Sequence, residues 1–63
     1  MFRAMEQMPN GEFTGFIMEA ENEDDIVTQI TNNYSEKTEW FVVNEDTDQE
    51  FIYNDEQCML EII

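Results

Sequence analysis

The chain has 63 residues, enough for one small domain (residues 1–63) and too few to bury a large core. Sixteen acidic residues against two basic ones give a formal net charge of −14 at pH 7, which excludes a nucleic-acid-binding or anionic-membrane-binding surface and favours basic protein partners. Because 41% of the residues are hydrophobic and 13% aromatic, the composition indicates a folded chain rather than a disordered acidic tail.

The first twenty residues predict a β-hairpin. Pro9-Asn10-Gly11 is a turn signal, since proline fixes φ and Asn-Gly tolerates positive φ. Residues 16–20 then alternate between the two faces of a half-buried strand. Gly15 interrupts this second strand, which indicates a bulge or a close backbone contact.

Residues 22–34 predict the helix of the chain. Asn22 is a suitable N-cap, and the acids at 23–25 lie in the first turn, where the helix dipole favours negative charge. One apolar stripe is formed by Ile26, Val27, Ile30 and Tyr34. Asn32 and Asn33 are expected to end the helix in the left-handed conformation.

Three further strands are predicted after the helix, at residues 38–43, 49–53 and 58–63, with an acidic loop at 44–48 and a turn at 54–56. The element order is β-β-α-β-β-β. We therefore predict an α+β fold, a small antiparallel sheet with one helix packed on one face.

Cys58 has no partner for an intramolecular disulfide, and its apolar neighbours favour a buried thiol. Neither a signal peptide nor a membrane span is predicted, so we expect a cytoplasmic location.

Adjacent apolar residues in the strands predict apolar side chains on both faces of the sheet. Trp40 and Phe41 must point in opposite directions, and the same holds for Phe51 and Ile52. One helix covers only one face. The other face is therefore expected to expose an apolar patch ringed by acids, which serves either a partner protein or a homodimer, so both a monomer and a homodimer remain open.

The acids fall into groups that are candidates for binding a partner. One group lies where the first hairpin meets the helix, and another lies in the second hairpin and continues at the next turn. The candidate residues are Glu21, Glu23, Asp24, Asp25, Glu45, Asp46, Asp48, Glu50, Asp55 and Glu56. Along an extended strand, Asp46, Asp48 and Glu50 would form a carboxylate row about 6.6 Å apart, comparable with the phosphates of a nucleic-acid backbone.

Other chemistries have little support in the sequence. Asn44, Asp46 and Asp48 have the 1, 3, 5 spacing of a calcium loop, but Gln49 stands where that loop needs glycine. The chain has no histidine to act as a general base near pH 7, and we predict neither an enzyme nor a cofactor or metal site. Arg3 and Lys37 are too few to bind phosphates, so no direct contact with nucleic acid is expected.

In size and acidity, the whole chain resembles the small inhibitor proteins of bacteriophages and other mobile elements, which include anti-CRISPR and anti-restriction proteins. The resemblance implies a nucleic-acid mimic that binds the basic nucleic-acid-binding surface of a target enzyme in the host cytoplasm, with a CRISPR effector as first choice. One alternative is an acidic adaptor or accessory protein that docks on a basic partner without imitating nucleic acid. Another is an antitoxin-like binder that folds on binding.

Overall fold

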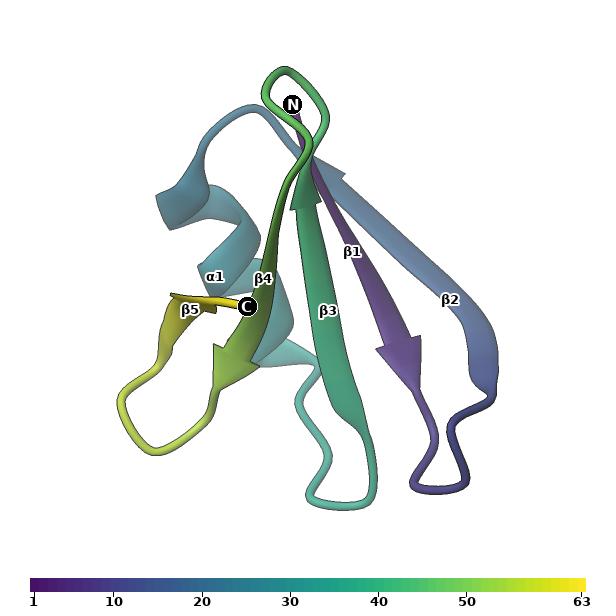
Figure 1. Cartoon of the computed structure of the whole chain (residues 1–63). Helices are drawn as coiled ribbons and strands as arrows, with labels where there is room; N and C mark the ends of the chain where they lie inside the picture. Colours follow the sequence, from purple (N-terminus) through teal and green to yellow (C-terminus); the bar gives the residue numbers. More distant parts are fainter.

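Five antiparallel strands form one sheet in the computed structural model, which describes all 63 residues (Figure 1). The strands are β1 (Phe2–Gln7), β2 (Phe13–Ala20), β3 (Glu39–Asn44), β4 (Gln49–Asn54) and β5 (Met59–Ile62), and the helix is α1 (Glu23–Asn32). In the sheet the strands lie in the order β2-β1-β3-β4-β5. The predicted α+β class and the element order β-β-α-β-β-β are both confirmed.

Two glycines with positive φ determine the geometry of the first hairpin, one in its turn and one in its second strand. Gly11 has φ +91° and donates its N–H to the Met8 carbonyl at 2.9 Å, which closes the predicted turn. Gly15 has φ +90° and lies where β2 places residues 14–16 opposite the single residue Glu6 of β1. The predicted bulge is therefore present, and only glycine adopts this backbone conformation without strain.

Helix α1 begins as the sequence predicts and ends differently. The Asn22 side chain accepts a hydrogen bond from the Asp25 N–H at 2.9 Å, which confirms the N-cap. Asn33 caps the other end with φ −115°, so the predicted left-handed ending is wrong. The reason is that the Asn33 amide donates to the Gln29 carbonyl at 2.8 Å, which satisfies a terminal carbonyl without reversing the chain.

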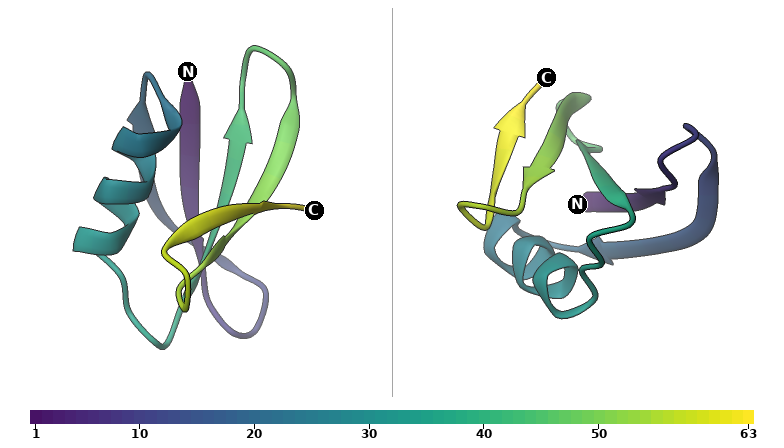
Figure 2. Two further views of the ribbon diagram at one scale, coloured as in Figure 1. Left: turned by 90° about the vertical axis from the view of Figure 1, so that its left-hand side faces the viewer. Right: turned by 90° about the horizontal axis from the view of Figure 1, so that it is seen from below.

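The core lies between α1 and one face of the sheet, called here the covered face (Figure 2). It consists of Ala4, Met18, Ala20, Ile26, Ile30, Trp40, Val42, Tyr53 and Leu60. Trp40 is the largest fully buried side chain, and the Phe16 ring meets it edge-on with centroids 5.5 Å apart. Each large aliphatic side chain buried here stabilises the fold by about 1.5–3 kcal/mol.

The β3–β4 and β4–β5 turns repeat one local structure. Asn44 Oδ1 accepts from the Asp46 N–H at 3.0 Å, and Asn54 Oδ1 accepts from the Glu56 N–H at 2.9 Å. Four residues after each asparagine the backbone has positive φ, 59° at Asp48 and 52° at Cys58. Because Cys58 ends this turn rather than starting β5, its thiol is exposed, and the predicted buried position is wrong.

Helix α1 is neither long nor apolar enough to cross a membrane.

Candidate functional site

Two acidic segments that are far apart in sequence meet at one end of the molecule. Phe2 pairs with Ala20 at the end of β2 and with Asn44 at the end of β3. Glu21 and Glu45 follow directly from these two residues, so the segments leave the sheet from the same row, about 10 Å apart across two strand spacings. Figure 1 shows the β2–α1 connection, the β3–β4 turn and the N-terminus together at this end.

This acidic end comprises eight of the ten candidate residues: Glu21, Glu23, Asp24, Asp25, Glu45, Asp46, Asp48 and Glu50. Two of them form ion pairs. Arg3 lies 3.3 Å from Glu45, and the Met1 amino group lies 2.9 Å from Asp46. The other six have no ionic partner, and Lys37 lies at the opposite end, between α1 and β3. The acidic end is therefore strongly negative.

Three of these carboxylates, those at 23–25, also stabilise the helix. They lie in the first turn of α1, next to its unpaired backbone N–H groups. Asp25 is further held by the Asn22 amide, which donates to its Oδ2 at 3.2 Å. The carboxylates at 21, 48 and 50 make no side-chain hydrogen bond and no ion pair, so nothing within the chain accounts for them.

The predicted carboxylate row of Asp46, Asp48 and Glu50 is wrong. Only Glu50 belongs to a strand, since residues 45–48 form the turn between β3 and β4. The Asp48 N–H donates to the Asn44 carbonyl at 2.7 Å, and its positive φ turns the chain back toward β4. The tight turn replaces the extended backbone that a regular row requires, so the acidic end presents a cluster.

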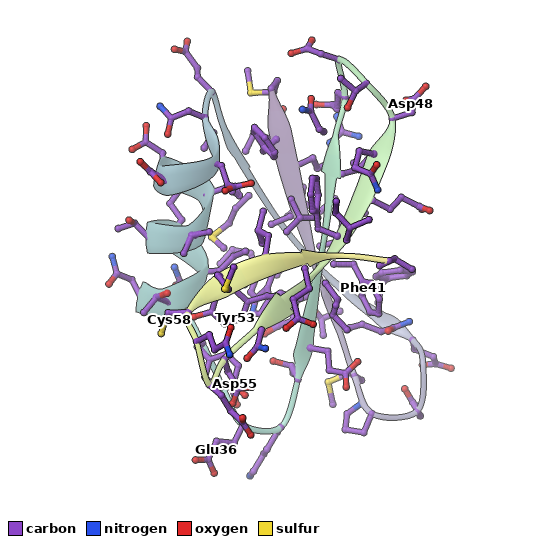
Figure 3. The ribbon with its side chains drawn as sticks, turned by 60° about the vertical axis from the view of Figure 1, so that its left-hand side comes forward. Glu36, Phe41, Asp48, Tyr53, Asp55 and Cys58 are labelled. Carbon is purple, nitrogen blue, oxygen red and sulfur yellow. The ribbon has the colours of Figure 1, made fainter.

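Asp55 and Glu56 do not continue this cluster. They lie in the β4–β5 turn, at the other end of β4 and about 20 Å from Asp48 along the strand. Figure 3 shows Asp48 and Asp55 at opposite ends. Asp55 accepts a hydrogen bond from the Tyr34 hydroxyl at 2.9 Å. This bond, followed by burial, raises the pKa of Tyr34 above its usual 10.0.

The second candidate surface is the face of the sheet that α1 does not cover, called here the open face. Ile17 pairs with Met5, Met5 with Phe41, and Phe41 with Ile52. Directly paired residues share a face, so these four side chains form one row across β2, β1, β3 and β4. Ile17 is 53% exposed and the others are half-buried. Figure 3 shows Phe41 on the side away from the helix and Tyr53 on the helix side.

The surface has no pocket, and no group of three or more His, Cys, Asp or Glu side chains is placed to hold a metal ion.

Sequence reasoning missed the turn repeat and the composition of the apolar row. The repeat has a signal, because the runs Asn-Glu-Asp-Thr-Asp and Asn-Asp-Glu-Gln-Cys occupy the same place between strands. The row has none in any single strand, because it depends on the register of four strands. The sequence did predict that Trp40 and Phe41 face opposite sides, which the structure confirms.

The chain matches no protein-family model, no curated protein and no solved structure. Fold and surface define it as a small acidic α+β protein.

Proposed function

We propose that this protein is an acidic inhibitor that binds the basic nucleic-acid-binding surface of a target enzyme and blocks access of nucleic acid. The observation that carries the proposal is the acidic end, where eight carboxylates from two distant segments gather and six have no ionic partner. The resemblance in size and acidity to phage-encoded inhibitors makes a CRISPR effector in the host cytoplasm the first target to test.

The charge density of the acidic end is comparable with that of a nucleic-acid surface. The two shorter dimensions of the molecule are 21 and 19 Å. A DNA duplex of about 20 Å carries about 12 phosphates, and about half of these face any one side. The six unpaired carboxylates therefore equal in number the phosphates that a basic groove would meet over the same length.

The mechanism is competition by charge. Lys and Arg side chains that hold phosphates would instead meet the carboxylates of the acidic end, and opposite charges would accelerate association. The turn and the first helical turn fix the backbone that carries these carboxylates, so binding has to order their side chains but not the chain itself. Binding should weaken steeply as salt increases.

The test compares two variants with the same change in charge. One neutralises the acidic end with Glu21→Gln, Glu23→Gln, Asp24→Asn and Asp48→Asn. The control neutralises four acids outside the acidic end and outside the open face, with Glu12→Gln, Glu36→Gln, Asp55→Asn and Glu56→Gln. Inhibition of DNA cleavage by purified CRISPR effectors, and of a restriction enzyme, is measured together with affinity capture from lysate and elution by duplex DNA or structured RNA.

The first variant should weaken binding by about tenfold or more and the control by about threefold at most, since each lost contact with a paired cation costs about 0.5 kcal/mol or more. Equal losses in both variants would contradict a defined site at the acidic end. A captured partner that neither DNA nor RNA displaces would contradict mimicry and favour the adaptor function instead.

A further inference from the structure

The open face contains an apolar centre with a charged border. The row Ile17–Met5–Phe41–Ile52 spans three strand spacings, about 14 Å. Continued onto β5, the row ends at Glu61, which pairs with Ile52. The residues that pair around it include three more carboxylates on the same face, Glu19, Glu39 and Glu50. Apart from Glu50, the open face shares no residue with the acidic end, so its occupant does not depend on the function proposed above.

The charges of this border argue against a second copy of the chain. Two open faces in contact would bring four carboxylates of each copy together, and each copy carries a net charge of −14. The single cation on the face, Arg3, is already paired with Glu45. Like charges facing each other across an interface cost free energy, and apolar contact over one short row would have to exceed that cost. A partner with basic residues around an apolar stripe has no such penalty.

We propose that the open face binds a basic amphipathic helix of a partner protein. An α-helix with apolar residues at i, i+4, i+7 and i+11 presents a stripe of about 16 Å, which matches the length of the row. Such a helix would lie across the strands. Lys and Arg residues beside its stripe would reach Glu19 and Glu50 on one flank and Glu39 on the other, with Glu61 at the end of the row.

The probe is a capped 18-residue helical peptide of Leu, Lys and Ala whose four leucines form one stripe. A scrambled peptide of the same composition has its leucines spread around the helix, so it has the same charge and no stripe. Binding is measured by backbone amide shifts and titration calorimetry at about 0.3 M salt, where the Debye length is below about 8 Å and purely electrostatic binding is weak. The striped peptide should bind at least tenfold more tightly and shift the amides of Met5, Ile17, Phe41 and Ile52.

Matched variants locate the contact. The double variant Ile17→Thr with Ile52→Thr should weaken binding of the striped peptide by about tenfold, because both positions lose apolar contact area. Threonine is also β-branched, so both positions remain suited to a strand. As the control, Ile62→Thr changes a residue that is 72% exposed but pairs with Phe51 on the covered face, and it should change affinity by less than twofold. Sedimentation of the free protein is measured alongside.

Three results would overturn the proposal. Equal affinity for the striped and scrambled peptides would show that charge alone binds them. Shifts confined to residues 21–25 and 45–48 would assign the contact to the acidic end. A wild-type dimer that dissociates in Ile17→Thr with Ile52→Thr would assign the open face to a second copy.

Discussion

The two faces of one sheet are both apolar, yet only one is part of the core. On the covered face, Ala4, Trp40 and Val42 are fully buried beneath α1. On the open face, one residue away along the same strands, Met5 and Phe41 are half-buried with no helix above them. Figure 2 shows the single helix on one side only. The difference shows that alternation in a strand assigns residues to faces, whereas burial depends on how many layers the chain supplies.

The largest expected effect tests this difference directly. Ile30 is fully buried on the covered side, and Ile30→Ala should destabilise the fold by about 2–5 kcal/mol through lost burial and a cavity. A domain of this size has a total stability of only about 3–9 kcal/mol, so the variant should be partly unfolded at 25 °C. Ile17→Ala, at a position that is 53% exposed, should cost about 1 kcal/mol or less. Urea unfolding followed by Trp40 fluorescence measures both, and similar losses would contradict the assignment of the faces.

The second-largest change in stability is expected from added salt, which should stabilise the protein. Two like charges 10 Å apart in water repel by about 0.4 kcal/mol, and many such pairs exist at a net charge of −14. Raising salt from 0.01 to 0.5 M reduces the Debye length from about 30 Å to below about 5 Å, so repulsion around the acidic end and the open face is screened. We expect the free energy of unfolding to increase by about 2 kcal/mol, which corresponds to a rise in Tm of about 10 °C, and the same result with sodium chloride and with potassium chloride. A Tm that falls with salt would contradict net repulsion.

The sequence predicted most of the fold because its local signals agree. The turn at residues 9–11, the N-cap at Asn22 and the strand-forming runs around Trp40 and Phe51 each indicate the element that the structure contains. The end of the helix was mispredicted because an asparagine caps a helix either through its backbone or through its side chain, and Asn33 uses its side chain. Nothing local distinguishes the two.

The candidate site was predicted in composition but not in arrangement. Glu21 and Glu45 are 24 positions apart in the sequence, and only the pairing of Phe2 with both neighbouring strands places them together. Asp55 was grouped with Asp48 because the two are close in sequence, although β4 separates the two turns. Proximity in sequence overestimates proximity in space whenever a strand intervenes, because a strand extends about 3.3 Å per residue.

A smaller effect on stability is expected in the β4–β5 turn, which precedes the buried Leu60. Cys58 has φ 52°, which costs a residue with a Cβ roughly 1 kcal/mol or more. Cys58→Gly should therefore stabilise the protein by about 0.5–1 kcal/mol, raising Tm by about 4 °C. Asp48→Gly at the equivalent position should gain less, because aspartate tolerates the left-handed region better. Calorimetry of both variants checks the order, and a loss of stability in Cys58→Gly would show that the thiol contributes a contact that outweighs the strain.

The smallest expected effect is a loss of stability at alkaline pH. It arises on the covered side of the sheet, where both tyrosines lie. The hydrogen bond to Asp55 raises the pKa of Tyr34, and burial raises the pKa of Tyr53, both from 10.0. A tyrosine whose pKa is higher in the folded state holds its proton longer there than in the unfolded chain. Its contribution is complete below pH 10 and is lost as pH rises from 10 through the folded-state value. Tm should therefore decline above pH 10.

Asp55→Asn removes the negative charge facing Tyr34 and tests the origin of its raised pKa. The Tyr34 pKa, measured from the chemical shift of its ring carbons, should return toward 10, while the pKa of Tyr53 changes less. A Tyr34 that already titrates at or below pH 10 in the wild-type chain would show that its hydroxyl does not donate to Asp55 in solution.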